Sequence, residues 1–305
     1  MNGLMLCEKY YKLYGEPMLR EKFPELLPRL AAGVCGRGSE NFGFDDETSR
    51  DHDFDPGFYI WLSEEDYKKY EFRLSRAYDA LPKELDGVKI IGDSVYETSR
   101  HGVKETKAFF CEFTGVMGVP ENNLQWLSLS QSDLACAVNG KIFYDGSGDV
   151  TALRKALSEM PEDVRLKKLA KNLVFAAQSG QYNYLRCISH KEEGAAAFAV
   201  AEFANNVCEA VFLLNKQYCP FYKWMFRAGK SLPVCSDAVI IAEEMIKSPL
   251  NEKNASLAED AAALITDELK KQGLSDYPSS FLEPHAYEVF GKIKDPELKA
   301  RHIMS

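Results

Sequence analysis

Residues 33–62, with the sequence GVCGRGSENFGFDDETSRDHDFDPGFYIWL, decide the fold of the first half of the chain. The run LAAGVCG at 30–36 is short and apolar and then becomes rich in glycine, which predicts a buried strand that ends in a tight turn. The run DHDFDPGFYIWL at 51–62 alternates in polarity and carries β-favouring aromatic residues, which predicts a second strand. The stretch therefore predicts two strands joined by a polar, glycine-rich connection.

The start of this connection has the composition of an anion-binding turn. Glycines at 36 and 38 allow the backbone to turn sharply and to bring amide N–H groups close to an anion. Ser39 begins a predicted short helix, and a helix N-terminus attracts phosphate. Gly38 and Ser39 are therefore the expected phosphate-binding residues. The competing interpretation is an ordinary polar turn at the surface.

Asp51 and Asp53 are separated by one residue on the predicted strand, so both carboxylates point to one face. Two hard oxygen ligands side by side suit Mg²⁺. One or two Mg²⁺ ions, with Mn²⁺ as the alternative, would hold phosphate oxygens and neutralise the charge that develops in phosphoryl transfer. Arg50 is an expected nucleotide contact, because an arginine held between carboxylates also reaches phosphate.

Beyond this stretch, the pattern predicts an α+β protein with a domain boundary near residue 150. The first domain, 1–148, contains a helix at 63–81 and further strands at 87–92, 107–113 and 141–146. A helix at 17–30 is expected to be broken or kinked by its prolines. The second domain, 149–305, is expected to be a helical bundle. Its predicted helices begin near 149 and then cover 161–178, 195–218, 236–247, 254–272 and 285–303.

Composition narrows the class of protein. The 305 residues are 46% hydrophobic and carry 46 acidic against 37 basic side chains, for a net charge of −9, which argues against long nucleic acid as the substrate. Eight scattered cysteines without a C-x-x-C pair argue against zinc and redox motifs and suggest reduced thiols. Without a signal peptide or an apolar run of membrane-spanning length, we expect a soluble, cytoplasmic protein with no membrane partner.

The stretch GSENFGFDDETSRDHDF at 38–54 resembles the signature of the nucleotidyltransferase superfamily, the group of DNA polymerase beta-like enzymes. It is more similar still to a bacterial branch known as domain-of-unknown-function family 4037. That resemblance continues at GKIFYDGSGDVTALRKAL (140–157), MPEDVRLKKLA (160–170) and QYCPFYKWMFRAGKSL (217–232). It implies a small mixed-sheet nucleotidyltransferase fold followed by an all-α helical bundle, and it assigns no substrate.

The resemblance also implies further site residues. Members of the superfamily usually add a third carboxylate, and Glu112 in KAFFCEF is the first candidate for this metal ligand or catalytic base, with Asp93 as the second. Lys223 is the lysine that the helical domain would place on the triphosphate. Their alternatives are a strand carboxylate that faces solvent and a cation that lies over aromatic rings.

The acceptor is the least defined part of the prediction. Tyr182, Asn183, Arg186 and Tyr222 are polar and aromatic residues suited to an acceptor or base pocket, and packing at the edge of the core is the alternative for them. We expect the transfer of a nucleoside monophosphate from a nucleoside triphosphate to an acceptor hydroxyl. A small molecule is favoured over a protein or tRNA. The alternatives are a nucleotide-binding or regulatory module without turnover, and a scaffold.

Overall fold

The computed structural model describes residues 2–46, 56–89 and 101–305, and these fold into two compact units. The first unit comprises 1–119 and 133–159, and the second comprises 120–132 and 160–305. The α+β class predicted from the sequence is confirmed, because the first unit holds a mixed sheet and the second is helical.

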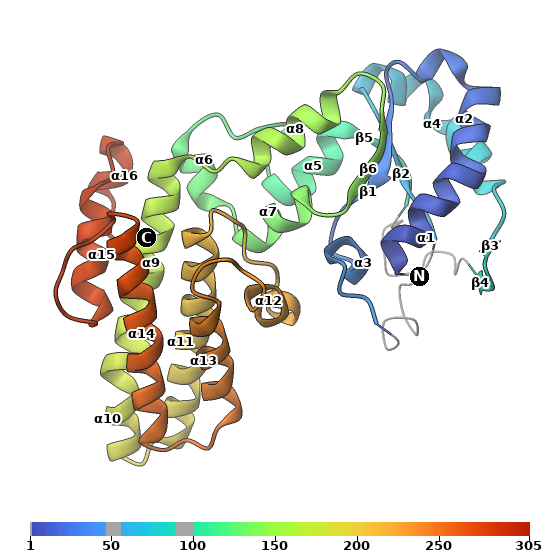
Figure 1. Ribbon diagram of the computed structural model, residues 1–305. Helices are drawn as coiled ribbons and strands as arrows, with labels where there is room; N and C mark the ends of the chain where they lie inside the picture. The colour runs from blue at the N-terminus through green and yellow to red at the C-terminus, as the bar shows by residue number, and fades with distance from the viewer. Residues whose placement is uncertain (1, 47–55, 90–100) are drawn as a thin grey trace. The chain divides into compact units, whose positions relative to one another are not determined.

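A four-stranded sheet forms the centre of the first unit, in the order β5-β2-β1-β6 (Figure 1). β1 is antiparallel to both of its neighbours, whereas β2 and β5 run parallel. The strands are β1 (Ala31–Val34), β2 (Tyr59–Leu62), β5 (Gly102–Glu105) and β6 (Lys141–Asp145). Strands predicted at 30–36 and 141–146 are confirmed, and the described part of 51–62 contains β2. Of 87–92, only Val88–Lys89 is described as a strand, β4, which pairs with β3 (Glu84–Leu85).

Alternation along the strands sends apolar side chains to both faces of the sheet. Ala32, Val34, Ile60 and Leu62 join a buried cluster with side chains from the N-terminal helices and from α4. On the other face, Trp61 contacts the rings of α5. The helices and helical turns of this half are α1 (Gly3–Tyr10), η1 (Tyr11–Gly15), α2 (Glu16–Lys22), η2 (Pro24–Leu26), α3 (Ser39–Phe42) and α4 (Glu64–Asp79). α2 ends before Pro24, so the predicted break in 17–30 is confirmed.

Residues 107–113 were expected to form a strand, and this prediction is wrong, because they lie in the helix α5 (Thr106–Thr114). The carboxylate of Glu105 caps the helix by accepting hydrogen bonds from the N–H groups of Lys107 and Ala108, at 2.9 and 2.6 Å. Phe109, Phe110 and Phe113 then bury one side of it. A short apolar run fits a strand and a helix equally well. Here the N-cap at Glu105 favours the helix.

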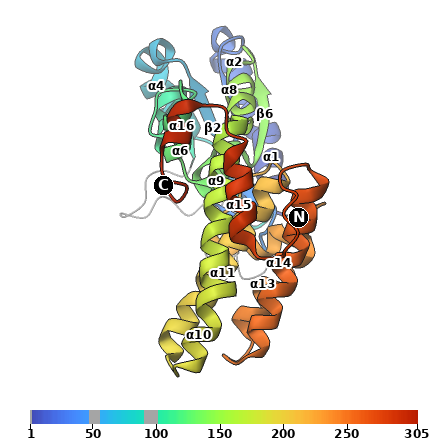
Figure 2. The same ribbon diagram turned by 90° about the vertical axis from the view of Figure 1, so that its left-hand side faces the viewer.

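Helices that run side by side form the second unit (Figure 2). α9 packs against α11 and α15, and α13 packs against α11 and α14. The remaining elements of the chain, of which α8 and most of α7 belong to the first unit, are α6 (Asn123–Ser128), α7 (Gln131–Val138), α8 (Asp149–Ser158), α9 (Glu162–Ala176), η4 (Ala177–Asn183), α10 (Tyr184–Ser189), α11 (Glu193–Leu214), α12 (Tyr222–Gly229), α13 (Ser236–Lys247), α14 (Lys253–Lys271), α15 (Leu282–Gly291) and α16 (Pro296–Ala300). The helix predicted at 285–303 is divided in two, because Pro296 starts a new helix.

α11 is the core helix of this bundle. It is long and apolar enough to cross a membrane by length and composition, but 67% of its apolar window is buried inside the protein. The prediction of a central buried helix at 195–218 is therefore confirmed, and the burial favours a soluble protein.

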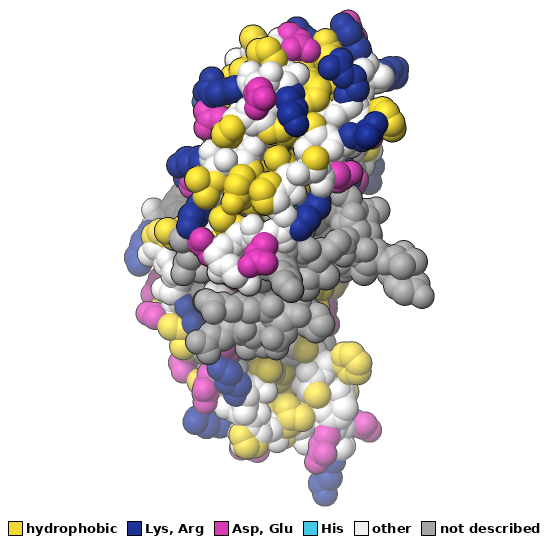
Figure 3. Space-filling view, turned by 90° about the vertical axis from the view of Figure 1, so that its right-hand side faces the viewer, with side chains coloured by type: hydrophobic (Ala, Val, Ile, Leu, Met, Phe, Trp, Pro, Cys, Tyr) yellow, Lys and Arg dark blue, Asp and Glu magenta, His cyan; other side chains and the backbone are white. Residues whose placement is uncertain are grey.

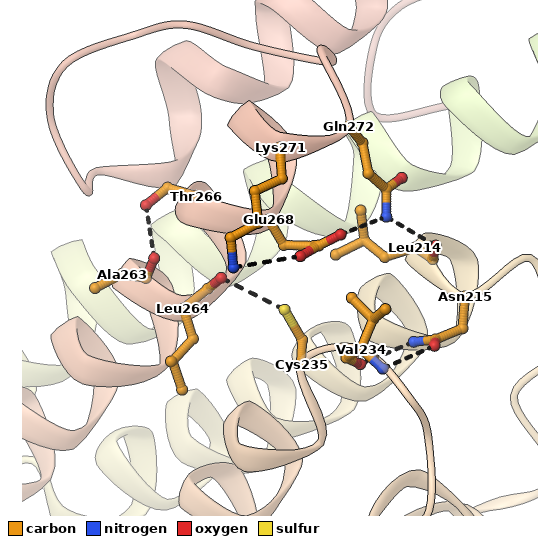
Figure 4. A network of polar contacts seen from close by, with 10 residues as sticks. All are labelled: Leu214, Asn215, Val234, Cys235, Ala263, Leu264, Thr266, Glu268, Lys271 and Gln272. Carbon is orange, nitrogen blue, oxygen red and sulfur yellow. Dashed lines mark hydrogen bonds and ion pairs between the residues drawn. The ribbon is translucent and has the colours of Figure 1, made fainter.

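Side-chain bonds to the backbone hold the end of α11 to the helices that follow (Figure 4). The amide of Asn215 donates to the carbonyl of Val234 at 2.9 Å and accepts from its N–H at 3.1 Å. Gln272 donates to the carbonyl of Leu214 at 3.1 Å. The Asn215 amide therefore pairs with both backbone groups of one distant residue, which fixes the start of α13 against α11.

Candidate functional site

The Gly-Ser turn after β1 and the residues just before β2 and β5 lie at the same edge of the sheet. β1 is antiparallel to β2, with Gly33 opposite Tyr59, and β2 is parallel to β5, with Tyr59 opposite Gly102. The carboxyl end of β1 therefore lies beside the amino ends of β2 and β5. The ring of His101 lies against Gly57, in the space that a side chain there would need, so the residues just before the two strands also touch.

The Gly-Ser turn leaves β1 at this edge and enters α3, whose N-cap is Gly38. Among the described residues, the N–H groups of Arg37, Gly38 and Ser39 make no hydrogen bond. A side chain at position 38 would overlap the Glu40 carboxylate, which folds back against this turn. The amide donors of the predicted phosphate-binding pair thus lack an acceptor among the described residues, although Gly38 is buried and the Glu40 carboxylate lies against it.

Asn139 and Gly140 hold this turn in place, and the sequence analysis did not single them out. The side chain of Asn139 accepts from the Gly36 N–H at 2.9 Å and donates to the Gly36 carbonyl at 2.8 Å. The N–H of Gly140 donates to the carbonyl of Asn41 at 2.8 Å. The dipeptide Asn-Gly before β6 was the available signal, because it marks a tight turn. The pair therefore fixes both ends of the 36–41 segment.

Two further interactions support this region from α7 and α8. Arg154, half-buried, donates to the carbonyls of Val138, at 2.8 Å, and Asn139, so it helps to position Asn139. Arg37 lies 3.3 Å from the carboxylate of Asp133, and its guanidinium stacks 5.4 Å from the centre of the Phe113 ring. Arg37 is an exposed cation within the turn itself, one residue before Gly38.

The predicted carboxylates have different outcomes. Asp51, Asp53, Arg50 and Asp93 lie outside the described residues. Glu112 is exposed on α5, so the expectation that it projects from a strand is wrong. Within 2–46, 56–89 and 101–305, no cluster of three His, Cys, Asp or Glu side chains is arranged to hold a metal.

The thiols are mostly buried, as the sequence suggested. Five of the eight cysteines are buried and three are half-buried. Burial raises the pKa of the Cys35 and Cys208 thiols to about 12 and that of Cys136 to about 11, which disfavours the reactive thiolate form.

The candidates in the second unit lie on its surface. Lys223 and Tyr222 are exposed at the start of α12, and the ammonium of Lys223 lies 5.7 Å from the centre of the Trp224 ring. Tyr182 and Arg186 are also exposed and stack on one another at 5.2 Å. Asn183 is exposed between them. Of these predicted residues, only Tyr222 lines the cavity described next.

A cavity of about 290 Å³, lined by both apolar and charged side chains, lies within the second unit. α9 contributes Lys168, Lys171 and Asn172, which share one face because they are spaced three and four residues apart. α11 contributes Glu209, and Gln131 lines the cavity from the start of α7. None of these five residues was selected from the sequence, although Lys168 lies in the segment 160–170 that carried the family resemblance.

Comparison with protein-family models supports the resemblance in one region. Residues 126–225 match the family described as a domain of unknown function (DUF4037). The predicted resemblance is confirmed for this range, which contains the whole lining of the cavity but not the Gly-Ser turn.

Comparison with known proteins and structures adds little. A search of curated proteins finds no match. Among solved structures, the chain is similar to a nucleotidyltransferase-like protein from Exiguobacterium sibiricum 255-15. The likeness covers 92% of this chain and 81% of that chain, with 12% identity and a TM-score of 0.39. This degree of likeness assigns no site residue.

Proposed function

We propose that this chain is a Mg²⁺-dependent nucleotidyltransferase that moves a nucleoside monophosphate from a nucleoside triphosphate to an acceptor hydroxyl. The observation that carries the proposal is the sheet edge where the Gly-Ser turn meets the starts of β2 and β5. In the sequence, Asp51 and Asp53 come shortly before β2, so the carboxylate motif and the anion-binding turn belong to neighbouring strands.

In this proposal the amides of Gly38 and Ser39 bind phosphate oxygens once the Glu40 side chain has moved away, and Arg37 adds a positive charge beside them. Asp51 and Asp53 bind the metal, with Mn²⁺ as the alternative ion. The ion, when bound, supplies charge stabilisation for the transferred phosphoryl group. Arg50 serves as a second cation on the nucleotide.

The third carboxylate is a choice between two residues. Glu112 stays the candidate that the resemblance implied. It was chosen as an acid in an apolar strand, however, and it lies instead on the exposed side of a helix. Asp93 precedes β5 in the sequence, and β5 is the parallel neighbour of β2. We therefore favour Asp93.

For the acceptor, a small molecule is favoured over a protein or tRNA. On the described part of the face in Figure 3, Lys and Arg side chains are interspersed with acidic and hydrophobic ones. This distribution and the net charge of −9 suit a compact ligand better than a long polyanion. Lys223, as a triphosphate contact, and Tyr182, Asn183, Arg186 and Tyr222, as acceptor contacts, stay predictions, as does a cytoplasmic location.

The test is pyrophosphate release. The purified chain is incubated with Mg²⁺, each labelled nucleoside triphosphate in turn and a panel of hydroxyl acceptors. We expect Asp51→Asn and Asp53→Asn each to reduce the rate by about 10³-fold, because losing several kcal/mol of charge stabilisation costs that factor. Asp79→Asn, which changes an exposed carboxylate at the end of α4, is the matched control and should keep the wild-type rate.

The alternative is a nucleotide-binding or regulatory module without turnover. It predicts that ATP with Mg²⁺ raises the melting temperature, since a ligand at one hundred times its dissociation constant stabilises by about 2.7 kcal/mol, while no acceptor yields pyrophosphate. Equal rates for wild type and both aspartate variants would contradict the enzyme proposal.

A further inference from the structure

The cavity of the second unit contains a carboxylate that is held in place by amide groups. Oε2 of Glu209 accepts hydrogen bonds from the side chains of Asn172 and Gln131, at 3.2 and 3.3 Å. Gln131 is itself fixed, because its carbonyl oxygen accepts from the N–H of Cys219 at 3.2 Å. Oε1 of Glu209 makes no hydrogen bond among the described residues and is not buried from solvent. One oxygen of an oriented carboxylate is therefore open to the cavity.

Two ammonium groups line the same cavity on α9. Lys168 donates to the carbonyls of Leu127 and Leu129, at 2.8 and 2.7 Å, so one of its three N–H groups is left over. Lys171 lies 6.0 Å from the centre of the Phe175 ring and forms no ion pair within the described part of the chain. Burial lowers the pKa of Lys168 to about 8, so an anion beside it would stabilise its charged form. Within the described part of the chain neither lysine forms an ion pair, although the charge of Glu209 acts on Lys168 across the cavity.

These opposite charges restrict the ligand. The carboxylate of Glu209 would repel a purely anionic ligand, and the two lysines would repel a purely cationic one. At about 290 Å³ the cavity is at the small end of ligand pockets, which suits a small molecule better than a nucleoside triphosphate. Tyr222 adds an aromatic wall, and its ring is packed on that of Phe221 with centres 4.2 Å apart.

We infer that this cavity binds a small zwitterion, a free α-amino acid, with its ammonium on Oε1 of Glu209 and its carboxylate on Lys171 and Lys168. Its side chain lies towards Tyr222. The binding site is independent of nucleotide transfer and would persist if the chain had no catalytic activity.

The first experiment uses the full chain without nucleotide. Its melting temperature is measured with each L-amino acid in turn, and the dissociation constant of the most stabilising one is measured by calorimetry. Removing either the carboxylate or the ammonium of that amino acid, as in the corresponding amine and the corresponding carboxylic acid, should weaken binding by about tenfold or more. No shift with any amino acid would overturn the inference, as would equal binding of the amine or of the acid.

Variants locate the binding. Glu209→Gln and Lys171→Met should each weaken binding of the same amino acid by about tenfold or more. The matched controls are Glu202→Gln, an exposed carboxylate on the same helix as Glu209, and Lys253→Met, an exposed lysine at the start of α14. Both controls should bind like wild type. Lys171 lies outside the amide network around Glu209, so its variant tests the site even if Glu209→Gln fails to fold.

Two outcomes separate this inference from the proposed function. Asp51→Asn should bind the amino acid as wild type does, whatever its effect on pyrophosphate release. Wild-type amino acid affinity in both Glu209→Gln and Lys171→Met would contradict the assignment of the cavity. So would a loss of ATP binding in these two variants when no amino acid binds.

Discussion

Lys168 shows how a single half-buried cation makes stability depend on pH. Its pKa is lowered to about 8 mainly by burial, which outweighs the opposing effect of Glu209, and Lys171 lowers it further. The ordinary value for the side chain is 10.5. Between these two values the unfolded chain binds more protons than the folded one, so stability increases as the pH rises.

Replacing Lys168 by Met removes this dependence. We expect the difference in unfolding free energy between wild type and Lys168→Met to shift by about 2 kcal/mol in favour of wild type from about pH 7.5 to about pH 9.5. The measurement is urea unfolding followed by circular dichroism at both pH values. Lys253→Met, which changes an exposed lysine, should show a constant difference. A constant difference for Lys168→Met would refute this pKa.

Some site residues can be predicted from local sequence and others cannot. Gly38 and Ser39 were selected because glycine and a helix start can be recognised within a few residues of chain, and their role in binding phosphate stays a prediction. Lys168 belongs to a pair of lysines in a helix, a pattern that usually faces water. In the structure its ammonium donates to the carbonyls of Leu127 and Leu129, about forty residues earlier. Such a partner is brought near only by the fold.

At the scale of elements, two asparagines connect segments that are distant in sequence. Asn139 forms two hydrogen bonds with the backbone of Gly36, and Asn215 forms two with the backbone of Val234. The sequence predicted the strand after Asn139, but the partner of the Asn139 side chain lies about one hundred residues away.

This similarity provides a matched pair of variants. We expect Asn139→Ala and Asn215→Ala each to destabilise the chain by about 1–3 kcal/mol, because each leaves backbone groups without their partners. Only Asn139→Ala should also weaken ATP binding, since only Asn139 holds the turn that presents the amides of Gly38 and Ser39. Unfolding curves and calorimetric titration with ATP and Mg²⁺ measure the two effects. Equal ATP affinity in both variants would show that the hydrogen bonds between Asn139 and Gly36 have no part in nucleotide binding.

At the scale of the whole molecule, the compact units differ from the predicted ranges 1–148 and 149–305. The sequence becomes strongly helical near residue 149, and α8 does begin there. Helical composition does not show which core a helix joins. α8, in which Val150 and Leu157 are buried side chains, packs on β6 and belongs to the first unit, whereas the earlier helix α6 packs on α9 in the second.

Fragments test this division. Residues 1–159 retain α8, whereas 1–148 lose the burial of Val150 and Leu157 and both hydrogen bonds of Arg154 to the carbonyls of Val138 and Asn139. Each apolar side chain contributes about 1.5–3 kcal/mol when fully buried. We therefore expect 1–159 to melt cooperatively and 1–148 to melt at a much lower temperature or to remain unfolded, as followed by circular dichroism.

A point variant separates the packing of α8 from the length of the fragment. Leu157→Ala in 1–159 should cost about 2–5 kcal/mol, because it leaves a cavity under α8. Lys155→Ala, on the exposed side of the same helix, should change stability by less than about 0.5 kcal/mol. If 1–148 were as stable as 1–159, or if Leu157→Ala behaved like Lys155→Ala, α8 would not belong to the core of the first unit.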